Sequence, residues 1–389
     1  MVKRQQTLKR QQTLKRKQTL KRKQKAGKFV GKGAYGCGFA PSLRCAGDTK
    51  PGEFSKLIEL KYANEEYAVR TLLEPIDPKQ IFFLYPLKLC KPSPDLEPLL
   101  NRNTTFRNLV NCNIMSINNP KARLIFYKNG GPDLSTIENL PAQDYGDFFV
   151  EMSQILQGLR LLHSSHICHL DIKRENLVAK AEGGSIHFRY IDFGFAINTA
   201  APFVPKKVYT NNYSIWPPEM KHINTLAGDR ILDFDKIKGV VGTDANLLRE
   251  YLLQKVDVYS LGRVYYRILK NLIGLTVNSQ NLLFLTEEDR DEFIPAAASA
   301  EWFTDVKNYI LIPYLRLVSA MLNLSPFHRI NAERAFFEYS LIRPQFRRLF
   351  TKENVQTHLS AVKPNLKRSL TNMISGFVGA RATAKVRPL

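Results

Sequence analysis

Hydrophobic and polar residues follow two different spacings along this chain. Helical spacing runs from Phe148 to His163 and predicts a helix there, and a shorter helix is predicted over Asn64–Leu73. Compact apolar runs at Phe54–Ile58 and Leu124–Tyr127 predict strands. The strands fall early in the chain and the helical pattern dominates the remainder, which predicts an α+β fold with a β-rich first part.

A further apolar pattern lies near the end of the chain, in the basic segment 351–389. After Pro364, six apolar residues fall on one helical stripe about 100° wide: Leu366, Leu370, Met373, Ile374, Phe377 and Val378. The pattern predicts a basic amphipathic helix. Two roles stay open for this helix, docking onto the rest of the chain or contact with an anionic membrane.

The opposite end of the chain is basic without such a stripe. Residues 1–28 repeat a six-residue unit, Lys-Arg-Gln-Gln-Thr-Leu in its first two copies, and hold twelve Lys and Arg but no acidic residue. One leucine in six builds no continuous helical stripe and the charges repel, so we predict a disordered tail. This tail either contacts nucleic acid or another polyanion, or it only solubilises the protein.

Composition bounds the rest of the protein. The two tails carry +12 and +6 of the net charge of +22, which leaves about +4 for the residues between them, an ordinary value for a globular enzyme. There is no run of 18 apolar residues and no apolar leader, so neither a membrane span nor a secretory signal is expected. The five cysteines are scattered and form no C-x-x-C pair. We therefore expect reduced cysteines in an intracellular, cytoplasmic protein.

Candidate chemistry is concentrated in one stretch. Residues 169–176 read His-Leu-Asp-Ile-Lys-Arg-Glu-Asn, and Asp-Phe-Gly follows at 192–194. Phosphoryl transfer from ATP needs a carboxylate that accepts or orients the proton of the substrate hydroxyl, and Asp171 is the candidate. Lys173 can neutralise the γ-phosphate. Asn176 and Asp192 offer the oxygen ligands that Mg²⁺ requires, with Mn²⁺ as a substitute.

A glycine-rich stretch upstream offers a phosphate-binding loop. It fits G-x-G-x-x-G, in which glycines let backbone N–H groups approach phosphates closely: Gly31, Lys32, Gly33, Ala34, Tyr35 and Gly36. Lys56 lies between apolar residues, 25 positions after Gly31, and is the candidate lysine for the α- and β-phosphates of ATP. Glu65 is its expected partner, because apolar residues follow Glu65 at +3, +4 and +7. Glu66 stays open as an alternative.

Taken together, these motifs resemble the eukaryotic-type protein kinases over residues 29–345. The resemblance implies a two-lobed fold, with a small β-rich lobe over 29–126 that holds one main helix and a larger helical lobe over 127–350. It implies ATP and Mg²⁺ as cofactors and protein substrates, basic ones included. A lysine at position 173 resembles the serine/threonine kinases rather than the tyrosine kinases. Backbone groups at Phe126 and Lys128 are expected to contact adenine, after a gatekeeper at Ile125.

The resemblance also assigns residues that support the fold. Trp-Pro-Pro-Glu at 216–219 stands in place of the family's A-P-E and implies a buried ion pair between Glu219 and Arg329. Asp257 stands at the start of a family helix, and its distance from Glu219 implies an insertion of about 25 residues between them. His169 is expected to pack beneath Phe193.

Leu170 stands where the family usually has an arginine that pairs with a phosphorylated loop. Its absence predicts that the loop 195–216 adopts its working form without modification. The sequence of residues 36–45, Gly-Cys-Gly-Phe-Ala-Pro-Ser-Leu-Arg-Cys, resembles a stretch of the serine/threonine kinases of large nucleocytoplasmic DNA viruses. That narrower resemblance implies a viral protein of the host-cell cytoplasm and leaves packaging in virions open.

The tail repeats suggest a substrate within the chain itself. Thr7, Thr13 and Thr19 each follow an arginine by three residues, an arrangement that basophilic kinases phosphorylate. Glu175 and Asp133 are candidate carboxylates for such an arginine. The alternative interpretation is that the threonines are inert spacers.

Two other functions share part of the pattern. A small-molecule phosphotransferase of the aminoglycoside-kinase type has H-x-D-x-x-x-x-N and a later aspartate. It is not expected to combine them with D-F-G, Pro-Pro-Glu and the closing Arg329. A non-catalytic nucleic-acid-binding protein would explain the basic tail but not the central motifs.

Overall fold

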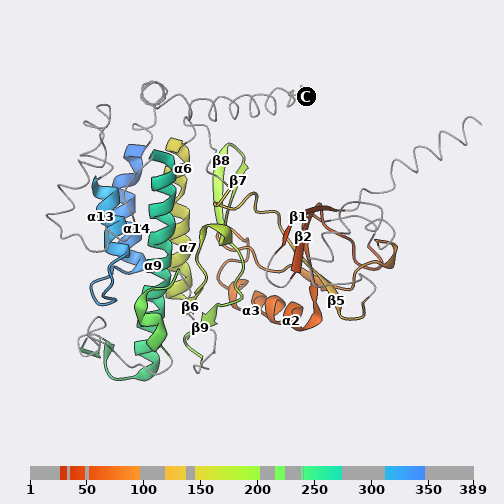
Figure 1. The fold of residues 1–389 in the computed structure, drawn as a ribbon, viewed down its shortest axis with the longest axis horizontal. Helices are drawn as coiled ribbons and strands as arrows, with labels where there is room; N and C mark the ends of the chain where they lie inside the picture. Colours follow the sequence, from red (N-terminus) through yellow and green to blue (C-terminus); the bar gives the residue numbers. More distant parts are fainter. Residues whose placement is uncertain are drawn as a thin grey trace, which may run out of the picture. The chain divides into compact units, whose positions relative to one another are not determined.

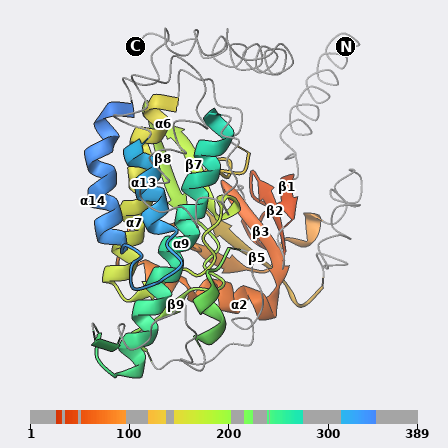
Figure 2. The same ribbon diagram turned by 60° about the vertical axis from the view of Figure 1, so that its left-hand side comes forward.

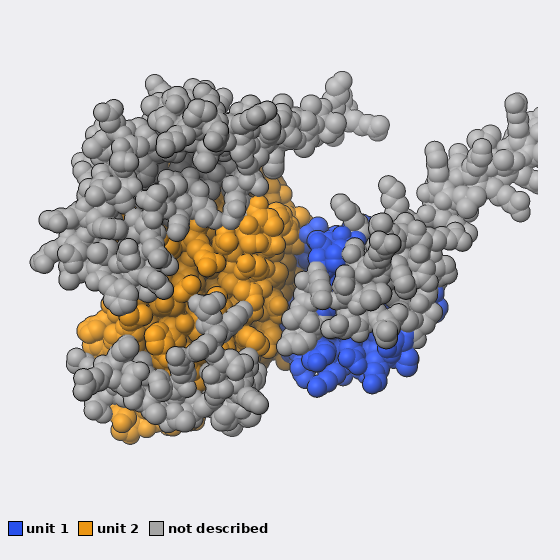
Figure 3. Space-filling view, in the orientation of Figure 1, with its two compact units in different colours: residues 1–70, 85–129 blue, residues 71–84, 130–389 orange. Residues whose placement is uncertain are grey.

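The structure is a computed structural model that describes residues 27–32, 36–48, 52–96, 119–136, 145–201, 215–223, 238–239, 241–273 and 312–346. The chain divides into two compact units (Figure 3). Unit 1 consists of residues 1–70 and 85–129, and unit 2 of residues 71–84 and 130–389. Unit 1 ends at Asn129, three residues after the expected end of the small lobe at 126. Residues 71–84, which were expected in the small lobe, belong to unit 2.

Unit 1 is built on a five-stranded antiparallel sheet with strand order β1-β2-β3-β5-β4. Strands β1, β2, β3 and β5 of this sheet are labelled in Figure 2. The strands are β1 (Lys28–Lys32), β2 (Gly36–Ala40), β3 (Phe54–Glu59), β4 (Lys88–Cys90) and β5 (Ala122–Tyr127). A short 3₁₀ helix, η1 (Pro94–Leu96), follows β4. The strands predicted at 54–58 and 124–127 are confirmed as β3 and β5.

The two faces of this sheet bury different residues, because successive side chains on a strand point to opposite sides. Leu57 and Leu124 face a cluster with Phe39 on one side. On the other side, Ile58 and Ile125 pack with Ala63 of the helix α2 (Leu60–Ala68). The strand β3 passes directly into α2, so β3 fixes the orientation of that helix from its first residue.

The boundaries of the first helix differ from the prediction of 64–73. α2 begins four residues earlier, at Leu60, and ends at Ala68, and a separate turn α3 (Arg70–Leu73) follows. Glu59 precedes α2 without a capping hydrogen bond from its side chain. The start therefore lacks the usual sequence signal for a helix N-terminus.

A disulfide bond joins Cys45 and Cys90 within unit 1. Cys37 is disulfide-bonded as well, whereas Cys168 is free and buried. The expectation of reduced cysteines is therefore wrong for this unit. Cys45 and Cys90 are 45 residues apart in sequence, and it is the bridge between Cys45 and Pro92 that brings their segments together.

Unit 2 is mostly helical (Figures 1 and 2). Its helices are α6 (Tyr145–Glu151), α7 (Ser153–Ser164), α9 (Ala245–Ile273), α13 (Ile312–Met321) and α14 (Ala332–Ile342). Short 3₁₀ helices are η4 (Arg174–Asn176), η6 (Pro218–His222) and η8 (Arg343–Gln345). Two small antiparallel sheets pair β6 (Ile167–Cys168) with β9 (Ile197–Asn198) and β7 (Leu177–Glu182) with β8 (Ser185–Tyr190). The helix predicted over 148–163 is present as α6 and α7, interrupted at Met152.

Buried aromatic residues hold these helices together. Tyr265 of α9 stacks on Tyr314 of α13, and Tyr339 of α14 packs edge-on against both. The hydroxyl of Tyr265 donates to the carbonyl of Met152 at 2.8 Å, which satisfies a polar group in the core. Burial raises the pKa of all three tyrosines, so they stay neutral there.

Within the described part of the chain, no helix combines the length and the apolar character that crossing a bilayer requires. The repeat tail up to residue 26 and the amphipathic helix predicted after Pro364 lie outside the described residues.

Candidate active site

In unit 1, Lys56 on β3 forms an ion pair with Glu66 on α2. The Nζ of Lys56 lies 2.6 Å from Oε2 of Glu66, and both side chains are less than one-fifth exposed. Glu65 is exposed, so the expected pairing of Lys56 with Glu65 is wrong. The reason is the helix register: Ala63 packs against the sheet, and Glu66, three residues later, shares its face. The apolar residues that favoured Glu65 do not fix the register, because Ala68 is exposed and α2 ends there.

Tyr127 is a contributor that the sequence analysis missed. Its hydroxyl donates to Oε1 of Glu66, so the carboxylate is held by Tyr127 on one oxygen and by Lys56 on the other. Tyr127 lies two residues after Ile125 on β5, and Ile125 is paired with Lys56 in the sheet. Strand alternation places Tyr127 on the same face as Ile125, a signal that was present in the sequence.

The glycine-rich stretch is described only in part. Gly31 and Lys32 end β1, Gly36 begins β2, and Gly33, Ala34 and Tyr35 lie outside the described residues. A Cβ at Gly36 would lie 2.4 Å from the carbonyl oxygen of Leu57, so this position requires glycine.

The predicted adenine contacts lie at the end of β5. The carbonyl of Phe126 accepts a hydrogen bond from the N–H of Leu87 at 2.8 Å, and exposed Lys128 follows the end of the strand. One lone pair of the Phe126 carbonyl is therefore used within unit 1. The contacts of Phe126 and Lys128 with adenine stay predictions.

In unit 2, Asp171, Lys173 and Asn176 form one hydrogen-bonded group. The Nζ of Lys173 lies 3.0 and 2.9 Å from the two carboxylate oxygens of Asp171. The amide nitrogen of Asn176 donates to Oδ2 of Asp171 at 2.7 Å and to its backbone carbonyl at 2.9 Å. Asp171 and Asn176 are both buried. These donors hold the Asp171 carboxylate in one orientation.

The proposed metal ligands come from adjacent segments of the same unit. The N–H of Ile191 donates to the carbonyl of Asn176 at 3.0 Å, which brings the segment before Asp192 next to Asn176. Asp192 is exposed and has a φ of 59°, in the left-handed region that non-glycine residues rarely occupy. Because the amide nitrogen of Asn176 faces Asp171, its amide oxygen remains as a ligand atom. An amide oxygen and a carboxylate fit Mg²⁺, which prefers oxygen ligands.

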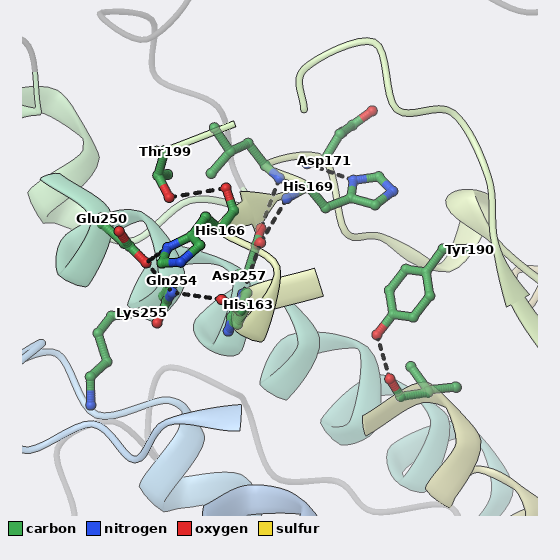
Figure 4. Close-up of polar contacts among 12 residues, drawn as sticks. His163, His166, His169, Asp171, Tyr190, Thr199, Glu250, Gln254, Lys255 and Asp257 are labelled. Atoms are coloured by element: carbon green, nitrogen blue, oxygen red, sulfur yellow. Dashed lines mark hydrogen bonds and ion pairs between the residues drawn. The ribbon is translucent and has the colours of Figure 1, made fainter. Parts of the chain in front are cut away.

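Asp257 holds the backbone just before Asp171 (Figure 4). Its two carboxylate oxygens accept the N–H groups of His169 at 2.7 Å and Leu170 at 2.8 Å. Oδ2 also lies 3.2 Å from Nε2 of His163. Asp257 is in the interior of α9, which begins at Ala245, so its expected position at a helix start is wrong. Part of the expected insertion is an N-terminal extension of this helix.

His169 packs against Phe193, as expected. The ring centroids are 4.5 Å apart, and the ring of Phe83 meets that of Phe193 edge-on at 5.9 Å. The segment of Phe83 is itself fixed in unit 2, because the N–H of Leu84 donates to the carbonyl of Tyr190 at 2.9 Å. The position of Phe193 sets the direction in which the neighbouring Asp192 leaves the core.

The predicted ion pair between Glu219 and Arg329 is present and fully buried. Arg329 also donates to the carbonyls of Lys255 at 2.9 Å and Asn323 at 2.8 Å. Lys255 donates in turn to the carbonyl of Arg329. Burial, reinforced by the charge of Arg329, lowers the pKa of Lys255 to about 8. This network joins the segments around 219, 255 and 329.

The atoms of His163, Cys168 and Asp257 that could bind a metal lie within 4.8 Å of one another, all buried. Burial raises the pKa of the Cys168 thiol, and the charges of Asp257 and Glu250 add to the effect. A neutral thiol is a poor metal ligand. Since both oxygens of Asp257 already accept backbone N–H groups, we assign this cluster a structural role.

Comparison with known proteins supports the interpretation of unit 2. Residues 103–225 match the model of the protein kinase domain family. The α+β fold, in which a β-sheet unit and a helical unit carry these motifs, agrees with this match, which covers less than half of the chain. Over this segment the chain is similar to protein kinase domains. The family match begins after Lys56 and includes Asp171, Asn176, Asp192 and Glu219.

Several curated kinases are similar to parts of the chain. An Aurora kinase of Dictyostelium discoideum is 26% identical over 148 residues, 38% of this chain and 30% of the relative. A probable serine/threonine protein kinase IRE of Arabidopsis thaliana is 25% identical over 218 residues, 54% of this chain and 17% of the relative. The MAP kinase kinase kinase wis4 of Schizosaccharomyces pombe is 32% identical over 127 residues, 33% and 8% respectively. The chain thus spans less than a third of the length of each of these relatives.

Proposed function

We propose that this chain is a serine/threonine protein kinase, which transfers the γ-phosphate of ATP to protein hydroxyls. The observation that carries the proposal is the hydrogen-bonded group of Asp171, Lys173 and Asn176, with Asp192 on the adjoining segment. The serine/threonine class is supported by Lys173 and by the similarity to the probable serine/threonine protein kinase of Arabidopsis thaliana.

Each residue has a distinct role in this proposal. Asp171 orients the substrate hydroxyl and accepts its proton, because its carboxylate is already fixed by two donors. Lys173, bonded to Asp171 in this structure, neutralises charge on the transferred phosphoryl group. Asn176 and Asp192 would hold Mg²⁺, which when bound neutralises charge on the triphosphate. In unit 1, Glu66 holds Lys56 extended for the α- and β-phosphates.

A phosphate-transfer assay with radioactive ATP and generic protein substrates tests the proposal. Wild type is expected to be active, while Asp171→Asn and Asp192→Ala each lower the rate by about a hundredfold or more. Full activity of Asp192→Ala would contradict the assignment. Phosphorylation of small molecules without any protein phosphorylation would favour the small-molecule phosphotransferase instead.

We further propose that this kinase needs no phosphate on its loop. Leu170 is fully buried in an apolar cluster with Trp216 and Met220, and a phosphate would find no cation at that position. Within the loop 195–216, Thr199 donates hydrogen bonds to the carbonyl of His166 through its N–H at 2.7 Å and its hydroxyl at 3.0 Å. Those contacts support an ordinary structural role for Thr199.

The narrower viral resemblance of residues 36–45, and the cytoplasmic and virion setting it implies, stay proposals based on those residues. Contacts of the tails with nucleic acid or membranes stay predictions, since both tails lie outside the described residues. Phosphorylation of basic substrates rests on Glu175, which is exposed on η4 beside the catalytic group.

A further inference from the structure

A buried hydrogen bond connects Trp216 to the residue before Asp171. The indole N–H of Trp216 donates to the carbonyl of Leu170 at 2.8 Å, and both residues are buried. This carbonyl belongs to the peptide unit that leads into Asp171. A change in its direction would rotate the backbone that carries the proposed proton acceptor.

The backbone at Leu170 needs such support. Its φ is 62°, a left-handed conformation that is unfavourable for a residue with a Cβ and persists only where the surroundings hold it. The carboxylate of Asp257 accepts a hydrogen bond from the N–H of Leu170, and the indole N–H of Trp216 donates to the carbonyl of Leu170. Both polar groups of this strained residue are therefore fixed, one by α9 and the other by the segment before η6.

Trp216 is itself held firmly. Its ring lies 6.1 Å from that of Phe195, and it belongs to a buried cluster with Met220 and Leu252. The neighbouring carbonyl of Ile215 accepts a hydrogen bond from Ser260 at 3.0 Å. Packing therefore holds the indole N–H that donates to Leu170 in place. Ser260 links the segment of Trp216 to α9, the helix that also carries Asp257.

We propose that Trp216 is a positioning residue for Asp171, which it orients through the carbonyl of Leu170. The inference rests on the proposed kinase activity and adds a residue to it that touches neither ATP nor substrate. If Trp216 only satisfied its own buried donor, its removal would lower stability without altering the catalytic step.

Trp216→Phe tests this directly, because the aromatic ring remains and the N–H is lost. Tyr265→Phe is the matched control: it also deletes a buried hydrogen bond from a side chain to a backbone carbonyl, but in the helical core. We expect Trp216→Phe to lower kcat about tenfold with the KM for ATP within about twofold. Assayed below its melting temperature, Tyr265→Phe should keep kcat and the KM for ATP within about twofold of the wild-type values.

Hydrogen exchange followed by mass spectrometry provides a readout independent of activity. Amides of residues 165–176 should exchange faster in Trp216→Phe and at the wild-type rate in Tyr265→Phe. Unchanged exchange, or equal losses of kcat in the two variants, would overturn the inference. If wild type phosphorylates no substrate, the kinase proposal fails, and the exchange result still decides whether Trp216 holds the Leu170 backbone.

Should Trp216→Phe fail to fold, the isostere β-(3-benzothienyl)alanine at position 216 replaces the indole N–H with sulfur and keeps the ring shape. The same fall in kcat and the same faster exchange are expected. A wild-type kcat and wild-type exchange in this variant would overturn the inference.

Discussion

Lys56 and Glu66 form an ion pair inside unit 1, with Tyr127 on the second carboxylate oxygen of Glu66. Both charged side chains are less than one-fifth exposed. The consequence of the pair is positional: β3, α2 and β5 each supply one member of the group. The ammonium group of Lys56 is therefore held in one place by a residue that is itself fixed from a second strand.

Replacing Glu66 should weaken nucleotide use far more than replacing Glu65. Glu66→Gln removes the charge that holds Lys56, and we expect kcat/KM for ATP to fall by about ten- to a hundredfold. Glu65→Gln is the matched control on the neighbouring exposed position and should stay within about twofold. Steady-state kinetics at varied ATP concentration measures both. A larger effect from Glu65→Gln would show that the pairing changes in the active enzyme.

The disulfide between Cys45 and Cys90 should stabilise unit 1. Closure of a 45-residue separation limits the unfolded chain, which gives about 4 kcal/mol in the loop-entropy model. The double variant Cys45→Ser/Cys90→Ser should lower the denaturation midpoint in urea accordingly. Cys168→Ala, which removes a buried free thiol, is the control for a cysteine change without loss of a cross-link. A double variant as stable as wild type would mean that the bond does not form in solution.

The stability of the protein should depend on pH through Lys255. Its pKa is about 8 in the folded protein against an ordinary value of 10.5, so between these values the unfolded chain binds the proton that the folded chain has released. Stability therefore rises with pH across this window. Relative to Lys255→Met, wild type should gain about 2 kcal/mol from pH 8 to 10.

Unfolding by urea at pH 7, 8, 9 and 10 measures this difference. The buried tyrosines are present in both proteins, so their ionisation cancels in the comparison. Parallel stability profiles for wild type and Lys255→Met would show that Lys255 keeps its ordinary pKa.

The grouping of Asp171, Lys173 and Asn176 follows from the sequence, because these side chains stand at short spacing, while their catalytic roles stay predictions. Asp171, Lys173 and Asn176 lie on one loop, and a few residues of separation leave little freedom. The same holds for the strands β3 and β5, whose apolar runs are local signals.

Longer-range features were predicted less well. The choice of Glu65 failed because a shift of one residue rotates a helix face by about 100°, and the uncapped start of α2 left its register open. The prediction that Asp257 lies at a helix start is wrong, because no signal in the sequence shows that this helix already begins at Ala245. The pairing of Cys45 with Cys90 depends on the course of the chain in three dimensions, which spacing does not reveal.

Dephosphorylation should leave the enzyme active. Because Leu170 contributes no cation, a loop phosphate has no partner there, and treatment with phosphatase is expected to retain activity within about twofold. Mass spectrometry of the treated protein confirms that the loop carries no phosphate. Thr210→Ala, at a position outside the described residues, should likewise stay within about twofold. A large loss of rate in either experiment, with the melting temperature preserved, would mean that a loop phosphate is required.

The N-terminal tail should be a substrate of the enzyme. Thr7, Thr13 and Thr19 each follow an arginine by three residues, and exposed Glu175 offers a carboxylate for a charge-assisted, bidentate contact with that arginine. Asp133 is a weaker candidate, since its carboxylate accepts the N–H of Ser135 at 2.9 Å. After incubation with Mg²⁺ and ATP, intact-mass analysis should show up to three added phosphates.

Glu175→Ala separates recognition from catalysis in this prediction. It should lower tail phosphorylation about tenfold more than phosphorylation of a substrate without arginine, whereas Asp171→Asn should abolish both. Each phosphate adds about −1.5 to −2 charges, so three would offset roughly half of the tail's positive charge and weaken its retention on heparin. If the tail threonines stay unmodified while another protein is phosphorylated well, the tail is not a substrate. An equal loss of phosphorylation rate for both substrates in Glu175→Ala would show that the Glu175 carboxylate does not bind the arginine.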